Sequence, residues 1–320
     1  MALRGKYEQS HWVLKVIQWI GCILVCSMIA AGSMFLFEQP LSVSALKWVQ
    51  FFQSTAMFLL PPLCMAYLWS EQPLRWLRVY SSPLLEGKGI RIGFGVVVLM
   101  LVALPAINLL GDINKQMTLP AFLESLEQWM KTSEESAKVL TEQFMHATTF
   151  GGLIINLLLM AVLPALGEEL TFRGVLQQLF EGKSLEDASL QNDSKAAYSL
   201  KARIPHLAIW CSAILFSAIH LQFYGFVPRM LMGALFGYAF VWTGSLWIPI
   251  LMHFTNNAAA VILYFISLRM GLDIEKVDAI GTGDTLWLGV VSMVITIIGI
   301  YAFRRSTTMS NASSRISSGS

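Results

Sequence analysis

Long apolar segments separated by short polar stretches run through the whole sequence. A helix needs about 20 predominantly apolar residues to cross the hydrocarbon core of a bilayer, and eight segments approach this length. The fourth begins near residue 150 and carries charged residues toward its far end. The other seven lie at about residues 12–37, 49–69, 93–110, 204–221, 227–242, 246–268 and 286–303. The pattern therefore predicts an all-α polytopic membrane protein with about eight transmembrane helices.

Residues 111–149 differ from the apolar segments because they are polar and net acidic. Apolar residues such as Phe122, Leu126 and Trp129 recur there at helical spacing. Residues 132–135 resemble a capping box that starts a second short helix. We therefore expect an extracytoplasmic, amphipathic helical insert. It forms either a hairpin on the membrane surface or a lid over a functional site, and we favour the surface hairpin.

Composition excludes a soluble globular domain, since 55% of the 320 residues are hydrophobic and only 13% are charged. The formal net charge of +2 gives no indication of nucleic-acid binding. The 4 cysteines lie in apolar segments without a CxxC pair, so they indicate neither a disulfide framework nor a zinc–thiolate site. We expect one integral membrane domain over residues 1–320, with a functional core at residues 150–268.

Charged residues in the loops predict the orientation of the chain. Basic residues cluster near the N-terminus, between the second and third segments, between the fourth and fifth, and after the eighth, whereas the loops after the third and seventh are acidic. Under the positive-inside rule both termini are cytoplasmic, and we expect the chain in a bacterial inner (cell) membrane. The Ser-rich tail, residues 304–320, is expected to be disordered, and residues 181–203 to form a hydrophilic loop.

Two adjacent carboxylates and an arginine follow the apolar start of the fourth segment with no polar linker. A charged side chain at the centre of a membrane helix costs about 2.5–3.5 kcal/mol on insertion scales. Glu168, Glu169 and Arg173 should therefore face protein or a water-filled cavity. Glu169 and Arg173 are four residues apart, in the favourable order for a pair on one helix face. Such a pair leaves Glu168 free for chemistry.

Further polar residues occur in two later segments. His220 ends the fifth, and His253 and Asn257 lie four residues apart, on one helix face, in the seventh. Each is costly in a membrane without a partner, so we predict one polar intramembrane cavity that gathers them with Glu168 and Glu169. With eight straight spans, however, Glu168 lies near the cytoplasmic end of its helix and His220 near the outer end of its own. The cavity therefore requires tilted, offset or broken helices.

Carboxylates, imidazoles and an amide are the groups that hydrolysis needs. Three short motifs carry them in order on separate segments: Glu168-Glu169-x-x-x-Arg173, Phe216-x-x-x-His220 and His253-x-x-x-Asn257. Over about residues 153–261 the sequence thereby resembles the CPBP family of intramembrane endopeptidases, also called the Abi family, which includes CAAX prenyl proteases and bacteriocin-processing enzymes. The sequence contains no HExxH motif, so a zincin of the soluble type is not indicated.

The resemblance implies a role for each motif residue. Glu168 would be the general base that activates water for attack on a peptide carbonyl. His220 would orient or deprotonate that water, or bind a metal. Glu169, counted among the catalytic residues, would be held by Arg173 or contribute to the polar cluster, and His253 and Asn257 would stabilise the oxyanion.

The resemblance leaves the question of a metal open, because family members have been described both as metalloproteases and as glutamate-dependent enzymes without a catalytic metal. Glu168, His220 and His253 are legitimate zinc ligands, but the same groups also make a metal-free acid–base site. A divalent metal such as zinc is the one cofactor that the residues suggest. Arg173 and Phe216 are expected to support the site structurally.

The expected function is endopeptidase activity toward a membrane-associated or lipidated protein or peptide. That substrate and the lipid bilayer are the expected partners, and nucleic acid is not. A non-catalytic membrane protein is the alternative: a transporter, or an immunity protein that binds a partner through the same cavity. A proton-coupled transporter also contains ionisable residues within the membrane.

Overall fold

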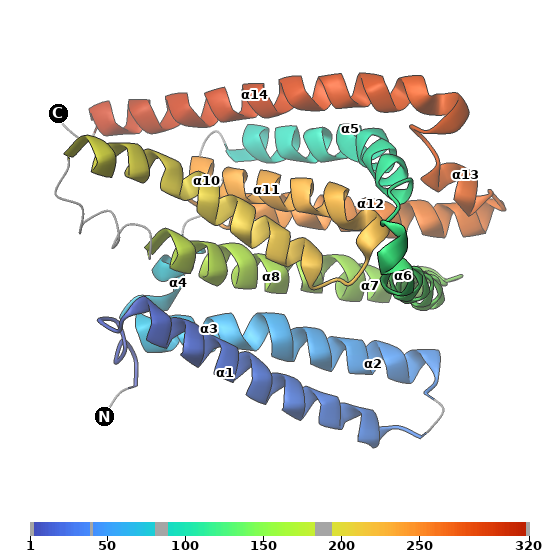
Figure 1. Ribbon diagram of the computed structural model, residues 1–320, viewed down its shortest axis with the longest axis horizontal. Helices are drawn as coiled ribbons and strands as arrows, with labels where there is room; N and C mark the ends of the chain where they lie inside the picture. Colours follow the sequence, from blue (N-terminus) through green and yellow to red (C-terminus); the bar gives the residue numbers. More distant parts are fainter. Residues whose placement is uncertain (1–2, 39–40, 81–88, 183–193, 318–320) are drawn as a thin grey trace.

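The computed structural model describes residues 3–38, 41–80, 89–182 and 194–317, and the regular elements of these residues are all helical (Figure 1). In this part of the chain, 7 helices are long and apolar enough to cross a membrane, and a further apolar helix segment, Pro205–Ala218, is shorter. The seven long helices and the shorter one follow one another in the order predicted from the apolar segments. The fold is therefore an all-α polytopic membrane fold, as predicted.

Long helices form the body of the molecule, and short 3-10 or π-helical turns interrupt several of them. The first part of the chain contains α1 (Trp12–Ala31), η1 (Gly32–Leu36), α2 (Val43–Ser54), η2 (Thr55–Leu59), α3 (Leu60–Trp69), α4 (Pro73–Trp76), α5 (Gly89–Lys115), η3 (Ala121–Leu123) and α6 (Glu124–Met145). The second part contains α7 (Phe150–Leu157), η4 (Leu158–Val162), α8 (Leu163–Glu169), η5 (Leu170–Gln177), α10 (Ser194–Ala218), η6 (Phe223–Gly225), α11 (Phe226–Thr243), α12 (Trp247–Met270), α13 (Ile274–Asp278), η7 (Gly283–Thr285) and α14 (Leu286–Ser317).

Most of the long helices lie side by side along the longest axis of the molecule (Figure 1). Helix α1 begins and α14 ends at the same end of this bundle, whereas α6 and α13 lie at the opposite end. The predicted even number of membrane crossings requires the first and the last helix to have their outer ends on the same side. The side of the membrane that each end faces stays a prediction from the loop charges.

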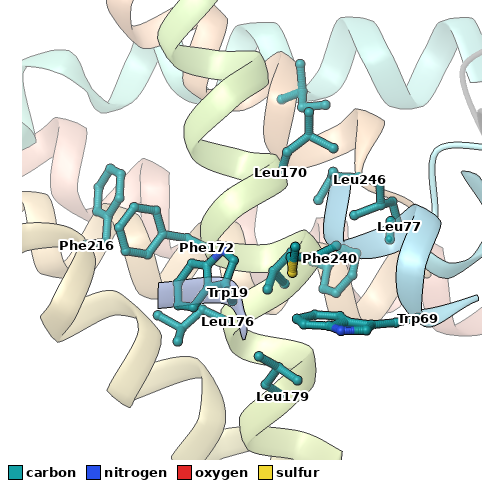
Figure 2. Packing of buried hydrophobic residues seen from close by; sticks show 14 of the residues in the cluster. Trp19, Trp69, Leu77, Leu170, Phe172, Leu176, Leu179, Phe216, Phe240 and Leu246 are labelled. Carbon is teal, nitrogen blue, oxygen red and sulfur yellow. The ribbon is translucent and has the colours of Figure 1, made fainter. Parts of the chain in front are cut away.

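The segment η5 lies at the centre of the bundle, because all of its residues from Leu170 to Gln177 are buried. A helix that is buried all round packs against other elements on every side. In Figure 2, Phe172 of η5 lies beside Phe216 of α10, and their rings meet edge to face with centroids 5.2 Å apart. The segment follows directly after the two glutamates, so this core fixes their position. Other members of the core are Trp19, Trp69, Leu77, Phe240 and Leu246.

Pro62 leaves a backbone carbonyl that a neighbouring helix satisfies. A proline has no N–H, so Pro62 cannot donate to the carbonyl of Phe58, four residues earlier. The hydroxyl of Thr171 in η5 donates to that carbonyl at 3.0 Å. Gly167 allows this close approach, since a Cβ atom at Gly167 would lie 2.9 Å from the Cβ atom of Phe58. The glutamate-bearing helix is thereby locked against η2.

The insert contains one helix of 22 residues, α6, so the predicted hairpin is wrong. The capping box fails because the hydroxyl of Thr132 donates back to the carbonyl of Gln128, 2.9 Å away, instead of accepting from a later N–H. Ser136 donates in the same way to the carbonyl of Thr132 at 2.8 Å. Hydroxyls that bond one turn back are compatible with a continuous helix.

Two polar stretches are more helical than the sequence predicts. Helix α14 continues to Ser317, which contradicts the predicted disorder for residues 304–317. No glycine or proline interrupts the chain there, and the hydroxyl of Thr307 donates to the carbonyl of Arg304 at 2.8 Å. Of the hydrophilic loop predicted over residues 181–203, residues 183–193 lie outside the described residues, and α10 begins at Ser194.

Candidate active site

Glu168 lies near the middle of the helical segment Phe150–Gly182, which is 33 residues long. The prediction that the acidic pair lies toward the far end of the fourth span is wrong, because the buried segment η5 extends the helix beyond it. Helix α10 ends at Ala218, and the left-handed backbone of Leu221 (φ 52°) turns the chain directly after His220. The end of α10 thus meets the middle of the fourth span, which removes the expected mismatch in depth.

Glu169 and Arg173 form the predicted ion pair, one helical turn apart. Nη1 of Arg173 lies 2.7 Å from Oε1 of Glu169, and neither side chain has any exposed surface. Nη2 of the same guanidinium donates to the carbonyl of Gly233 at 2.6 Å. The ring centroids of Phe216 and Phe236 lie 4.8 Å and 5.4 Å from its Cζ atom. Arg173 is therefore held between α8, α10 and α11.

Glu168 faces two histidines. Its Oε2 atom lies 3.9 Å from Nε2 of His220 and 3.9 Å from Nε2 of His253. These distances are too long for direct hydrogen bonds. Oε2 is buried and has no hydrogen-bond partner among the described residues. Because a buried carboxylate oxygen without a partner is costly, the site calls for a small polar group in the space between the three side chains.

The two histidines differ in the acceptor that the Nδ1 atom of each ring contacts. Nδ1 of His253 lies 2.8 Å from Oε1 of Glu169, and Nδ1 of His220 lies 2.7 Å from the backbone carbonyl of Phe216. Both acceptors assign a proton to Nδ1, so each ring presents Nε2 to Glu168. With its proton on Nδ1, a neutral imidazole keeps a lone pair on Nε2, and the ring donates through Nε2 only when it carries both protons. The ring of Phe216 supports both, with centroids 5.2 Å from His220 and 5.9 Å from His253.

Asn257 lies one turn after His253 in α12 and reaches the fourth span. Its Nδ2 atom donates to the carbonyl of Met160 at 3.2 Å, and its Oδ1 atom accepts from Nδ2 of Asn256 at 3.1 Å. The amide is therefore fixed in orientation. One of its two N–H groups is not used by these bonds and remains for another acceptor.

A cavity of about 680 Å³ brings Glu168, His220, His253 and Asn257 to one surface. Glu169 is fully buried behind His253, to which it is hydrogen-bonded. The structure therefore gathers four of the five predicted site residues around one space and places the fifth behind a histidine.

Helix α6 covers part of this cavity. The carboxylate of Glu134 accepts from the backbone N–H of Tyr224 at 3.3 Å, and the ring centroids of Trp129 and Phe223 lie 5.3 Å apart. These contacts hold α6 against η6, beside the end of α10. The arrangement agrees with a lid rather than with a helix that lies apart on the membrane surface. The cavity residues of α6 are Ala137, Leu140, Thr141, Phe144 and Met145.

Sequence reasoning missed eight polar residues that line the cavity: Gln50, Asn108, Lys115, Thr141, Gln222, Arg229, Asn256 and Asp278. Arg229 carries a usable signal, because it is a charged residue within an apolar segment, as Glu168 is. Gln222 and Asn256 carry none by themselves. The turn after α10 places Gln222, and the rotation of α12 about its axis places Asn256. Both features depend on how the helices pack in the folded protein.

The possible zinc ligands Glu168, His220 and His253 lie farther apart here than the ligands of a bound tetrahedral zinc ion. Among the described residues, no group of three or more His, Cys, Asp or Glu side chains is placed to hold a metal. Tetrahedral zinc ligands at about 2.1 Å from the metal lie about 3.4 Å from one another. Oε2 of Glu168, in contrast, lies 3.9 Å from the Nε2 atoms of His220 and His253. We therefore derive no step through a metal.

The part of the chain that builds this site matches a known family. Residues 150–259 match the family model described as Rce1-like, type II CAAX prenyl endopeptidase. The resemblance to the CPBP family is thereby confirmed. The matched range includes all three motifs, from Glu168 to Asn257. No curated protein and no solved structure matches the chain.

Proposed function

We propose that the protein is an intramembrane endopeptidase in which Glu168 activates a water molecule for attack on a peptide bond. The position of its Oε2 atom carries the proposal: it lies 3.9 Å from Nε2 of both His220 and His253, at the surface of one cavity. The family match supports the same class of reaction, since its description names an endopeptidase. The proposed substrate is a membrane-associated or lipidated protein or peptide.

One water molecule between the three side chains would complete the hydrogen bonds that they leave open. It donates one hydrogen bond to Oε2 of Glu168 and another to the lone pair on Nε2 of His220. Both bonds leave a lone pair of the water oxygen free to attack the carbonyl carbon, while Glu168 takes up a proton as the general base. The new C–O bond produces a tetrahedral intermediate with a negatively charged oxygen.

His253 and Asn257 are the proposed donors to this oxyanion. In this scheme His253 carries both ring protons, with Nδ1–H bonded to Glu169, so its Nε2–H can donate, and Asn257 retains an N–H that its bond to Met160 does not use. Glu168 then returns its proton to the amide nitrogen, the C–N bond breaks and the amine leaves. The steps balance with water as the only co-reactant.

Glu169 is a positioning residue in this scheme, because it contacts His253 and Arg173 rather than the reacting atoms. It fixes the proton on Nδ1 of His253 and aims Nε2 into the cavity. This differs from the catalytic role that the sequence resemblance implies for it.

The test uses the full-length protein in liposomes with a substrate found by comparing the membrane and secreted proteomes of a deletion strain and its parent. Glu168→Gln keeps the shape of the side chain and removes the base. We expect it to fold normally and to lower the rate of cleavage by about 10²–10⁴, the range for loss of a general base. Glu275→Gln changes an exposed carboxylate of α13 and should cleave at the wild-type rate.

Near wild-type cleavage by Glu168→Gln would overturn the proposal. Accumulation of the substrate inside vesicles, without cleavage by the wild type and with no loss in Glu168→Gln, would favour the transporter instead.

A further inference from the structure

Arg229 of α11 lines the same cavity as Glu168 and the two histidines, but it has no role in the steps above. Its guanidinium donates through Nη1 to the backbone carbonyl of Gln222 at 3.3 Å and through Nη2 to Oε1 of the same residue. These bonds fix the head group beside the turn that follows His220. A guanidinium carries five N–H donors, so the two bonds leave three of them for another acceptor.

The charge of Arg229 has no contact partner of opposite sign. No carboxylate of the described residues lies within 4.0 Å of it, in contrast with Arg173, whose partner lies at 2.7 Å. Glu134 and Glu168 act on it only over a longer distance. Arg229 also lies in the candidate span Phe223–Thr243, and charged side chains within membrane segments almost always pair. A cation that only neutral groups hold in a polar cavity is suited to bind an anion.

The cavity gives a ligand access to this guanidinium. Gly225 and Pro228 line the cavity next to Arg229. A Cβ atom on Gly225 would lie 3.2 Å from Nη2 of Arg229, so a larger residue at position 225 would crowd the guanidinium group. The glycine therefore keeps one side of the head group open.

We propose that Arg229 binds a carboxylate of the substrate near the scissile bond and so determines which bond is cut. The inference rests on the proposed function, because it takes the occupant of the cavity to be a peptide that Glu168 cleaves. The planar fork of an arginine matches the two oxygens of a carboxylate, and Arg229 is already held in place by Gln222. The carboxylate comes either from the C-terminus of a chain that ends shortly after the scissile bond or from an acidic side chain.

The experiment uses the full-length protein in liposomes and three versions of one fluorescent, lipidated peptide. The first has a free C-terminal carboxylate, the second a C-terminal carboxamide, and the third a carboxamide together with a glutamate as its last residue. We expect the wild type to prefer the first over the second by about tenfold or more in kcat/KM, as for a charge-assisted hydrogen bond. Cleavage of the third peptide as fast as the first assigns the carboxylate to a side chain, and slow cleavage assigns it to the C-terminus.

Arg229→Gln should bring the ratio between the first two peptides close to one. The ratio is taken within each variant, so a general loss of activity through the turn at Gln222 cancels. Arg229→Lys keeps the charge without the fork and should retain part of the preference. Arg269→Gln changes an exposed arginine that bonds to the carbonyl of Thr148, and it should keep the wild-type ratio.

Equal ratios in the wild type and Arg229→Gln would overturn the inference, while cleavage that depends on Glu168 would leave the proposed function standing. If none of the peptides is cleaved, the ratio is measured from Kd values by fluorescence anisotropy. A ratio of Kd values that depends on Arg229 then supports the inference even though the proposed function fails with these peptides. Equal Kd values for the first two peptides in the wild type, the absence of measurable binding included, overturn it.

Discussion

The side-chain amide of Asn257 in α12 donates to the backbone carbonyl of Met160, 3.2 Å away in the π-helical turn η4. That carbonyl loses its usual helical partner, because the residue four positions later is Pro164, which has no N–H. A buried acceptor left without a donor costs about 1–3 kcal/mol in soluble proteins. Asn257 therefore supplies the donor that Pro164 lacks in the helix that carries the glutamates. The same hydrogen bond holds the Asn257 amide beside them.

Removal of the Asn257 amide should destabilise the protein through this carbonyl. We expect Asn257→Ala to lower the free energy of unfolding by about 0.6 kcal/mol, the average measured for interhelical hydrogen bonds in a membrane, and by no more than the maximum of about 1.7 kcal/mol. Pro164→Ala restores an N–H to the helix, so Asn257→Ala should cost less in that background. Melting temperatures in detergent of the wild type, both single variants and the double variant measure the coupling. Strictly additive effects would show that the two residues do not share the carbonyl.

Spacing along one helix predicts the parts of the site that depend on that helix alone. Glu169 pairs with Arg173 because residues four apart share a helix face, and His253 and Asn257 share a face of α12 for the same reason. The cost of polar groups in lipid then predicts that separate helices bring theirs to one cavity, as Glu168 and its two histidines show.

Contacts between helices determine the features of the fold and the site that residue spacing and the cost of polar groups do not predict. The carbonyls that Pro62 and Pro164 leave free are satisfied by Thr171 and Asn257, which come from other parts of the fold. The sequence around Thr132 suits either a cap or a hydroxyl that bonds back one turn, and only the backbone path of α6 selects between them. For the same reason the depth of the glutamates within the membrane follows from the buried packing of η5, which residue spacing does not encode.

Loss of Arg173 alone should destabilise the protein more than loss of the whole ion pair. Arg173→Ala leaves the buried carboxylate of Glu169 unpaired, and breaking a buried pair in this way costs about 3–5 kcal/mol. Arg173→Met with Glu169→Gln removes both charges, and the new amide oxygen can still accept from His253. We expect melting temperatures in detergent to fall from the wild type to the double variant to Arg173→Ala. Arg269→Ala, at an exposed position, is the control, and equal stability of Arg173→Ala and the wild type would contradict the assignment.

Reporter fusions test the predicted orientation of the chain. Helices α5 and α14 end at opposite ends of the bundle (Figure 1), so fusions after Met117 and after Ser317 should report opposite sides of the membrane. The positive-inside rule predicts that alkaline phosphatase is active only at the first site and that a fluorescent protein folds only at the second. Both reporters active at the same site, or both sites on one side, would refute the topology.

Helix α6 should loosen when its two contacts with η6 are removed. Trp129→Ala with Glu134→Ala deletes the ring contact with Phe223 and the acceptor for the N–H of Tyr224. We expect amide hydrogen exchange in α6 to accelerate by about tenfold or more, which corresponds to about 1.4 kcal/mol of opening free energy. Lys138→Ala removes an exposed side chain from the same helix and should leave exchange unchanged. Unaltered exchange in the double variant would mean that other contacts hold α6 over the cavity.

The length of the side chain at Glu168 should matter separately from its charge. Oε2 lies 3.9 Å from both histidine nitrogens, a spacing that one water molecule bridges. Glu168→Asp keeps the carboxylate but withdraws it by roughly 1.5 Å, the length of one C–C bond, so the water no longer reaches all three groups. Because a displacement of about 1 Å can cost about 100-fold in rate, activity should fall between those of the wild type and Glu168→Gln.

The pH dependence of the remaining activity separates these two defects at Glu168. A general base acts only in its deprotonated form, so cleavage by the wild type and by Glu168→Asp should decline as the pH is lowered and the carboxylate takes up a proton. Glu168→Gln has no group to titrate at this position, so its residual activity should lack the part of the decline that the carboxylate causes. The measurement is kcat/KM across the acid range for all three proteins in the same liposomes. Protonation of His220, whose neutral ring accepts from the water, can add a second decline that all three proteins share. A profile of Glu168→Gln identical in shape to that of the wild type would mean that Glu168 contributes no titration, and Glu168 would then not be the base.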